Sequence, residues 1–233
     1  MIAFGKALMR SAVAIGLVLP ISPVDAALLH QYSFDNTTND AVGGMNATLA
    51  GNAQVTANGL VLDGTSGTYA QISGYAIPTS DFTITFDATI TAYNNGQVVE
   101  MISQGYSGGP GFYIGLAGGQ FRLGDQLTAT NVPTPSLNVQ HSYELVSNSS
   151  GTQFYIDGTE VFTSSIEVTA PQTGTATRVG NQFSPYNENF NGTISDLSIY
   201  SGAASVPEPA SLVLLGSGIF TLALMRRRAR RLD

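Results

Sequence analysis

The sequence predicts an all-β fold, a sandwich of two antiparallel sheets, for the part of the chain between its two ends. Residues 82–90 alternate apolar and polar side chains for nine positions, which is the period of a strand with one buried and one solvated face. Short apolar runs recur roughly every eight to twelve residues, separated by turn signals such as Asp157-Gly158. No helical periodicity of useful length occurs between residues 27 and 206.

Residues 1–26 predict a secretory signal peptide. Lys6 and Arg10 form a positively charged start, and residues 12–19 form an apolar run. Val24-Asp25-Ala26 places small residues at the −3 and −1 positions of a cleavage site, so we expect a mature protein that begins after Ala26. The alternative, a permanent N-terminal anchor, is weaker because the apolar run is short and a processing site follows it.

The first strand of the mature domain is predicted by Leu28, His30, Tyr32 and Phe34, which share one face. Further strands are expected at the short apolar runs, which cover residues 98–102, 112–116, 121–123, 143–146, 154–156 and 194–200. The apolar faces of these strands must meet between the two sheets. The side chains expected in that core include Ile84, Phe86, Phe154, Ile156 and Leu197.

Residues 154–162 predict a tight hairpin. Asp157-Gly158 lies between two apolar runs, and both residues accept the positive φ that a two-residue hairpin turn requires. Other turns are marked by Asp63-Gly64, Asn94-Asn95-Gly96, Gly108-Gly109-Pro110 and Gly118-Gly119.

The charge of the chain is unevenly distributed. Most of the nine basic residues lie in the two terminal segments, and only Arg122 and Arg178 fall within residues 27–206. The same window holds eight aspartates and five glutamates, which gives it a formal charge of −11. Such a surface excludes nucleic-acid binding by phosphate neutralisation and suits solubility or cation binding. The chain has no cysteine, so the exported domain must rely on its core rather than on disulfides.

Residues 204–233 predict a segment that inserts into a membrane. Pro207, Glu208 and Pro209 come first, and residues 210–225 form an uncharged, mostly apolar run. As a helix these sixteen residues would be about 24 Å long, which is shorter than the ~30 Å hydrocarbon core and needs flanking residues to adapt. The arginines that close the chain are Arg226, Arg227, Arg228, Arg230 and Arg231. They would stay in the cytoplasm and leave the preceding domain outside.

These three parts, in this order at the C-terminus, resemble the PEP-CTERM sorting signal of Gram-negative bacteria. The resemblance implies an inner-membrane anchor, processing near Pro207-Glu208-Pro209 by an exosortase-type membrane enzyme, and delivery to the cell envelope or the exopolysaccharide matrix. The alternative is an ordinary C-terminal membrane anchor.

The order of the predicted strands resembles the laminin-G-like, concanavalin A-like jelly-roll domains. The most characteristic part is the closing pattern Phe190-x-Gly192-x-Ile194-x-Asp196-Leu197-x-Ile199-Tyr200. The resemblance implies a single jelly-roll domain over residues 27–203. It also implies a family that includes carbohydrate-binding modules, lectins, adhesion domains and a few glycoside hydrolases.

The candidate catalytic groups do not form a recognisable site in the sequence. A glycoside hydrolase needs two carboxyl groups across a groove, yet four of the domain's five glutamates, Glu100, Glu144, Glu160 and Glu167, stand alone. Glu100 is flanked by apolar residues; it is either a buried acid with a raised pKa or, as the sequence favours, a residue at a solvated face or edge. His30 and His141 are expected to be packed histidines. We therefore expect a protein that is not an enzyme.

Sugar binding is the more plausible activity. Tyr93, Tyr106, Tyr113 and Tyr186 lie in or beside loops rich in Gly and Asn, and each could stack on a sugar ring. The alternative, which is the more common role of such residues, is that they are ordinary tyrosines of a sandwich.

Asp35 and Asp196 are candidate ligands of a structural Ca²⁺. Domains that the chain resembles often hold calcium between the loop after the first strand and an acid of the last strand, and these two residues occupy the matching positions. Apart from Asp40, the loop of residues 36–40 supplies no further acid. The alternative is that Asp35 caps its own loop and that Asp196 makes one local hydrogen bond.

Together these observations predict an exported, non-catalytic surface or matrix protein that binds carbohydrate. A structural or adhesive protein that binds protein partners is the main alternative, and a glycoside hydrolase is the less favoured one. The sequence does not distinguish which polysaccharide would be the partner.

Overall fold

A computed structural model describes residues 26–94, 96–106, 109, 111–182 and 188–203. Within these residues the chain is all-β and contains no helix. The strands are β1 (Ala27–Tyr32), β2 (Ala47–Ala50), β3 (Gln54–Thr56), β4 (Gly59–Asp63), β5 (Tyr69–Ile72), β6 (Phe82–Ala92), β7 (Val98–Gly105), β8 (Gly111–Ala117), β9 (Gln120–Leu123), β10 (Gln140–Asn148), β11 (Gly151–Ile156), β12 (Thr159–Ser164), β13 (Thr175–Val179) and β14 (Asn191–Ser201).

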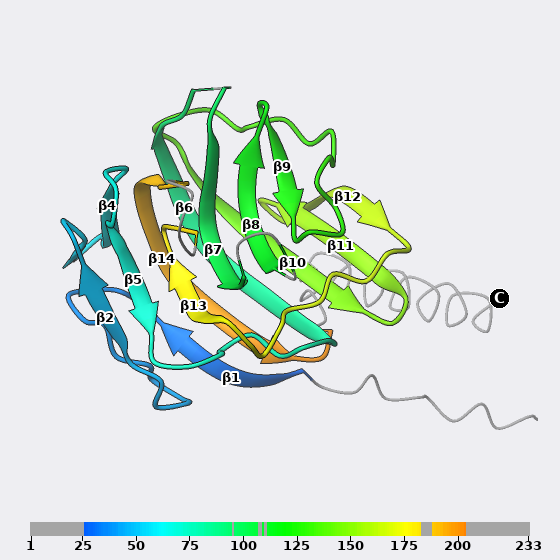
Figure 1. Cartoon of the computed structure of the whole chain (residues 1–233), viewed down its shortest axis with the longest axis horizontal. Helices are drawn as coiled ribbons and strands as arrows, with labels where there is room; N and C mark the ends of the chain where they lie inside the picture. Colours follow the sequence, from blue (N-terminus) through cyan, green and yellow to red (C-terminus); the bar gives the residue numbers. More distant parts are fainter. Residues whose placement is uncertain (1–25, 95, 107–108, 110, 183–187, 204–233) are drawn as a thin grey trace, which may run out of the picture.

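The strands form two antiparallel sheets that pack face to face (Figure 1). The eight-stranded sheet has the order β12-β11-β10-β6-β14-β4-β3, with β1 paired to β14 beside β4. The six-stranded sheet has the order β2-β5-β13-β7-β8-β9. The predicted sandwich of two antiparallel sheets is therefore confirmed.

Strand β6 forms the centre of the eight-stranded sheet, as its alternating sequence predicts. It pairs with β10 on one side and with β14 on the other. Ile84, for example, lies opposite Leu145 on β10 and opposite Ile199 on β14, so three apolar side chains line up on the inner face. Cross-strand pairs of this kind fix the register, because a slip by one residue would turn the apolar set towards water.

Aromatic side chains from both sheets fill the core between them. Phe121 of β9 packs against Phe154 of β11 and Tyr143 of β10, with ring centroids 5.0 and 5.7 Å apart. Phe86 stacks on Tyr143 at 5.1 Å. The predicted core positions Ile84, Phe86, Phe154 and Leu197 are buried. The fifth, Ile156, is only partly buried, because it ends β11 beside the hairpin turn.

The hairpin predicted at residues 154–162 is confirmed as β11–β12. Ile156 lies opposite Thr159, and the two turn residues have φ of 52° at Asp157 and 73° at Gly158. Glycine carries no penalty in this left-handed region and aspartate carries a small one, so the dipeptide suits the turn.

The sequence analysis does not predict β2, β3 or β13 as strands. These strands have only three to five residues, and their Ala, Thr and Gln side chains lack a strong apolar alternation. Tertiary pairing determines them: β13 lies between β5 and β7, and β2 pairs with β5. Strands β2 and β13 thus belong to the six-stranded sheet, and β3 pairs with β4 at the edge of the eight-stranded sheet.

The predicted signal peptide and the predicted C-terminal helix lie outside the described residues. In the part of the chain that the structure does describe, no helix has the length and hydropathy needed to cross a membrane.

Candidate functional site

The outer face of the six-stranded sheet gathers a polar and aromatic set of side chains. Along β5, Ala70 and Ile72 point into the core, whereas Tyr69 and Gln71 alternate with them and remain partly exposed. The same alternation and the strand register place on this face Thr48, Tyr69, Gln71, Ser103, Tyr113, Arg122 and Arg178. Both arginines of residues 27–206 therefore lie on one face of one sheet.

Arg178 of β13 is held flat against this face by uncharged groups. Its guanidinium lies over the ring of Tyr69, with Cζ 4.2 Å from the centroid. Its Nε donates a hydrogen bond to Oε1 of Gln71 at 2.9 Å. Its Nη1 donates to Oδ1 of Asn181 at 3.4 Å and to the carbonyl of Gln182 at 3.2 Å. The side chain is thus fixed in orientation while its charge stays unpaired with any carboxylate of the described residues.

Arg122 of β9 sits differently, because carboxylates surround it. Its Nη2 lies 2.9 Å from Oε1 of Glu100 and 3.8 Å from Oε2 of Glu188. The guanidinium also covers the ring of Tyr113, with Cζ 3.8 Å from the centroid. The Tyr113 hydroxyl donates to Oδ1 of Asp125 at 3.0 Å, and burial raises the pKa of that hydroxyl. The positive charge of Arg122 is therefore balanced by carboxyl groups of the protein itself.

Glu100 is fully buried, so the solvated position that the sequence favours is wrong. Burial raises the pKa of Glu100 well above its usual range, against the attraction of Arg122, and Glu188 raises it further. If both were ionised, Glu100 and Glu188 could not hydrogen-bond each other, because neither carboxylate would carry a proton. Within the described residues, no donor other than Arg122 reaches the oxygens of Glu100. A proton on Glu100 lets one carboxyl donate to the other.

Gly115 makes room for this buried carboxyl. It lies opposite both Glu100 and Arg122 in the strand pairing, and a Cβ at this position would overlap Oε2 of Glu100. The backbone of Glu100 also donates to the carbonyl of Glu188 at 3.1 Å, which joins β7 to the end of the loop before β14. Together with Arg122 of β9, the pair therefore connects three segments that are distant in sequence. Two carboxyls in direct contact do not match the separation of about 5–9.5 Å that glycoside hydrolysis requires.

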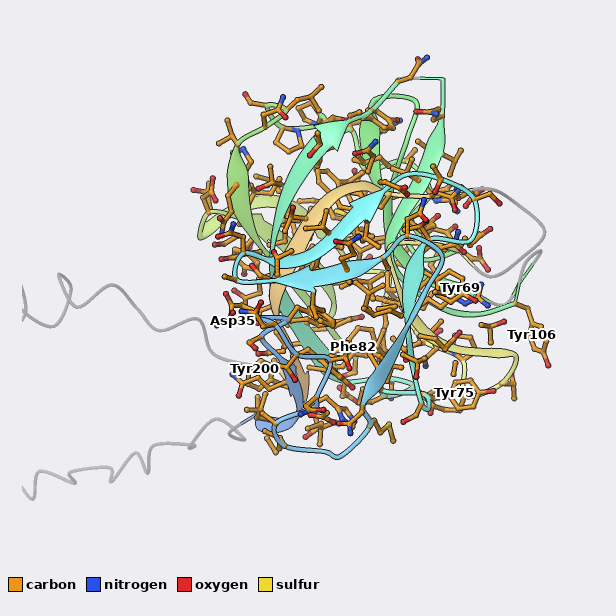
Figure 2. The ribbon with its side chains drawn as sticks, turned by 90° about the vertical axis from the view of Figure 1, so that its left-hand side faces the viewer. Asp35, Tyr69, Tyr75, Phe82, Tyr106 and Tyr200 are labelled. Carbon is orange, nitrogen blue, oxygen red and sulfur yellow. The ribbon has the colours of Figure 1, made fainter. Side chains whose placement is uncertain are left out.

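Tyr75 and Tyr106 form an aromatic edge beside this face. The Tyr75 hydroxyl donates to the carbonyl of Gly174 at 2.8 Å. On the other side, a Cβ at Gly174 would lie 3.0 Å from Cδ1 of Tyr106. Gly174 has a φ of 86° and packs on the carbonyl of Gly105, so only glycine fits between the two tyrosines without strain. Tyr106 is 49 % exposed. Figure 2 shows Tyr69, Tyr75 and Tyr106 on one side of the molecule, and Asp35 and Tyr200 on the other.

The predicted sugar-binding tyrosines do not all meet. Tyr106 belongs to the aromatic edge, and Tyr113 lies under Arg122 with 3 % of its surface exposed. Tyr93 lies at a different place, where its hydroxyl donates to the carbonyl of Gln97 and accepts from the amide of Gly119. Tyr93 thereby ties two turns together. Tyr186 lies outside the described residues.

The predicted calcium ligands both lie on the surface. The amide of Asp196 donates to the carbonyl of Ser33 at 3.4 Å, which brings it beside the end of β1, and a β-bulge turns its side chain outward. The carboxylate of Asp35 accepts from Nδ2 of Asn36 at 2.7 Å. Across residues 26–203 as described, no group of three or more His, Cys, Asp or Glu side chains is placed to hold a metal ion. Calcium binding by Asp35 and Asp196 stays a prediction.

Asp40, the further acid of that loop, serves another purpose. Its carboxylate accepts hydrogen bonds from Nδ1 of His30 at 2.7 Å and from the amides of Gln31, Val42, Gly43 and Met45. Burial alone would raise its pKa, but these hydrogen bonds outweigh burial and lower it. The carboxylate is thereby fully engaged in fastening its loop to β1.

Both histidines are packed, as predicted. His30 is buried against Asp40. Nδ1 of His141 lies 2.7 Å from Oδ2 of Asp157, which lowers the pKa of Asp157, and its ring packs near Tyr143. Neither histidine faces the two arginines.

A separate hollow of about 210 Å³ lies at the turn between β10 and β11. Its lining consists of small polar side chains and backbone, namely Asn148, Ser150, Gly151, Thr152, Gln153, Thr163 and Ser164. It offers neither an aromatic ring nor a titratable group, so it is a weaker candidate than the outer face of the six-stranded sheet.

Sequence reasoning missed Arg178, Tyr69, Gln71, Tyr75 and Glu188 as site residues. One signal was present, because Arg122 and Arg178 are the only basic residues of the mature window. Their common location was not visible, since the contact of Arg178 with Gln71 joins residues 107 positions apart.

Two family models match the chain. A model described as the concanavalin A-like lectin/glucanases superfamily, of laminin-G-like type, matches residues 63–208. A model of the PEP-CTERM protein-sorting motif matches residues 205–231, and this motif indicates a secreted protein that is targeted to the cell envelope. No curated protein matches the chain significantly.

Solved structures with the same fold include domains of an arabinanase, a sialidase and a mosquitocidal protein. Domain 4 of AbnA, a GH43 extracellular arabinanase from Geobacillus stearothermophilus, solved with arabinotriose, has a TM-score of 0.61 and 20 % identity over 78 % of this chain and 95 % of that domain. A sialidase from Trypanosoma rangeli has a TM-score of 0.58 and 17 % identity over 77 % of this chain, which spans only 31 % of the sialidase. The binding domain of Paraclostridial mosquitocidal protein 1 has a TM-score of 0.56 and 14 % identity over 77 % of this chain and 50 % of that chain. At these identities the likeness is one of fold.

Proposed function

The chain belongs to the concanavalin A-like lectin/glucanases superfamily, and from that premise we propose that it binds carbohydrate through the outer face of the six-stranded sheet. The observation that carries this proposal is the aromatic edge of Tyr75 and Tyr106 beside the fixed polar groups of Gln71 and Arg178. Sugar rings stack their apolar faces on aromatic rings and pair their hydroxyls with amide and guanidinium groups. This part of the face offers both kinds of contact.

The location of the protein supports a polysaccharide as the partner. The PEP-CTERM motif marks the chain for export to the envelope, where exopolysaccharide is abundant. We infer that an exosortase-type enzyme processes the chain near Pro207-Glu208-Pro209, after a stage in which residues 210–225 anchor it in the inner membrane of a Gram-negative cell. The mature domain then resides in the envelope or the extracellular matrix.

The neighbouring solved structures suggest the first probe. Domain 4 of the Geobacillus arabinanase was solved with arabinotriose, so arabinan fragments belong in the first panel, together with other neutral and acidic polysaccharides. The likeness to that domain concerns the fold, and the panel must therefore be broad.

A polysaccharide array tests the proposal directly. The full chain, solubilised in mild detergent, is applied to immobilised polysaccharides in calcium and in chelator. The expected result is a saturable signal on at least one polysaccharide, which the same soluble glycan competes away. Tyr106→Ala should weaken the signal at least tenfold, because it removes the exposed ring, and Tyr200→Ala on the opposite side should leave it unchanged.

Three other outcomes would redirect the proposal. No competed signal on any polysaccharide would favour an adhesive protein with protein partners. An equal loss in both tyrosine variants would move the site away from the six-stranded sheet. New reducing ends released from a bound polysaccharide would show a hydrolase, and the contact between Glu100 and Glu188 would then need to open during the reaction.

A further inference from the structure

The two arginines on the outer face of the six-stranded sheet differ in what neutralises them. Arg122 lies between Glu100 and Glu188, so its charge is balanced within the protein. Arg178 contacts only the ring of Tyr69, two amide oxygens and one carbonyl, and no carboxylate of the described residues lies at ion-pair distance. In a window with thirteen acids and two bases, a cation that has no acidic partner is unexpected.

The half of the sheet that carries Arg178 also lacks acids. Strands β2, β5 and β13, which form this half of the sheet, contain no aspartate or glutamate. The neighbouring side chains on the outer face are Thr48, Gln71 and Ser103, all of them uncharged. The guanidinium therefore presents a local positive charge on a neutral patch of an otherwise acidic domain.

The guanidinium is fixed in one orientation, and part of its donor capacity is unused. An arginine carries five N–H donors. Nε and Nη1 use theirs on Gln71, Asn181 and Gln182, whereas Nη2 has no hydrogen-bond partner among the described residues. Stacking on Tyr69 prevents the group from rotating away. Because its side-chain entropy has already been lost, a new charge-assisted hydrogen bond to Nη2 would be formed at little further entropic cost.

From this arrangement we propose that Arg178 binds a carboxylate of the ligand, so that the glycan recognised by this face contains uronic acid residues. This inference rests on the proposed carbohydrate binding and specifies its substrate class. The carboxylate pairs with Nη2, and the sugar ring extends along β13 towards the aromatic edge. Thr175, next to Gly174, lies about 10 Å from Arg178 along the strand at ~3.3 Å per residue, which is a span for a short oligosaccharide rather than for one sugar.

The acidic charge of the whole domain sets the conditions for this binding. A formal charge of −11 repels a polyanion at long range, but screening limits that repulsion to about 8 Å at physiological ionic strength. The Arg178 contact acts within hydrogen-bond distance and is screened less. Binding should therefore be measured at 0.15 M salt, where the Debye length is about 8 Å and the long-range repulsion is screened.

Polygalacturonate and two uncharged forms of the same polymer provide the test. In one form the carboxyl groups are reduced to alcohols, and in the other they are methyl-esterified. The full chain is titrated with each polymer in chelator, because calcium would cross-link polygalacturonate. We expect the native polymer to bind at least tenfold more tightly than either uncharged form, a difference of about 1.4 kcal/mol or more.

Variants of the protein show which residue causes the preference for the native, charged polymer. Arg178→Gln should bind all three polymers with similar affinity, and Arg178→Lys should retain only part of the preference because lysine cannot stack flat on Tyr69. Tyr106→Ala should weaken all three polymers alike, and Tyr200→Ala should change none. Unchanged melting temperatures would show that the variants are folded.

Two results would overturn the inference. Equal affinity of the unmodified protein for all three polymers would remove it without any variant, and a preference that survives in Arg178→Gln would place the carboxylate site elsewhere. If the array detects only neutral polysaccharides, carbohydrate binding stands and the carboxylate inference falls. If it detects none, both fall.

Discussion

At the scale of single residues, Glu100 illustrates the limit of sequence pattern. Its neighbours Val99 and Met101 are apolar, and such a run fits either a buried strand or an edge. Its burial depends on Gly115, Arg122 and Glu188, which come from other segments. No local sequence pattern could predict that Glu100 pairs with Glu188, because the two residues are brought together only after the strands have paired.

The buried pair predicts a pH dependence with a definite sign. The folded protein holds a proton on Glu100 at pH values where the unfolded chain, with a glutamate pKa near ~4.3, has lost it. The folded state therefore binds more protons, and stability falls as pH rises from about 4.3 towards the folded pKa, by up to about 1.4 kcal/mol per pH unit. Glu100→Gln should remove this fall, because its amide does not titrate.

Urea denaturation between pH 5 and 8 checks this prediction as a difference between curves. The Glu100→Gln protein should gain stability relative to the unmodified protein as pH rises. The stability curve of Glu160→Gln, at an exposed position on β12, should stay parallel to that of the unmodified protein. Parallel curves for Glu100→Gln would show that Glu100 titrates normally.

The calcium prediction for Asp35 and Asp196 also belongs to this scale. If they share a bound ion, saturating calcium should raise stability by mass action, by about 2.7 kcal/mol at one hundred times the dissociation constant. Asp35→Ala should abolish the shift in melting temperature, and Glu160→Gln should retain it. Identical melting curves of the unmodified protein in calcium and in chelator would end the hypothesis. Because Asp40 is engaged with His30 and the backbone, the remaining ligands must be backbone or amide oxygens.

At the scale of elements, prediction from sequence follows the strength of the apolar alternation. Strand β6 and the β11–β12 hairpin are confirmed because their periodicity and turn residues act locally. Strand β13 was not identified because its pairing with β5 and β7 determines it. Arg178, the charged residue of the candidate site, lies on that strand, and for this reason it was missed together with it.

Phe86 tests the register of β6. Its ring is buried and stacks on Tyr143, so Phe86→Ala should cost about 3–5 kcal/mol through lost transfer energy and the cavity left behind. Val161→Ala, a 39 % exposed position on β12, should change stability by about 0.5 kcal/mol or less. Chemical denaturation measures both variants. A near-zero effect of Phe86→Ala would contradict the assigned inner face.

At the scale of the whole molecule, a concanavalin A-like sandwich is followed by a sorting tail. The family models identify both parts, and the tail could be recognised from sequence because its three parts are contiguous. The face proposed to bind the ligand could not be recognised in this way. It combines strands β5, β7 and β13, whose order in the sheet differs from their order in the chain.

The sorting tail predicts a processed C-terminus. Mass spectrometry of the surface-exposed protein should find an end near Pro207 to Ala210, and a chain truncated after Val206 should appear as a soluble periplasmic protein. Replacing Arg226, Arg227 and Arg228 by glutamine should leave the chain unprocessed if the cluster is part of the signal. Recovery of the complete arginine cluster in the mature surface pool would instead indicate a plain membrane anchor.

Hydroxyl-radical footprinting of tyrosines shows whether the outer face of the six-stranded sheet contacts a glycan, as proposed. The full chain is oxidised with and without the polysaccharide that the array identifies, and oxidation is read by mass spectrometry. We expect protection of Tyr69, Tyr75 and Tyr106, which lie on one side of the molecule, and none of Tyr200 on the other. Protection of Tyr200 without protection of the other three would contradict it.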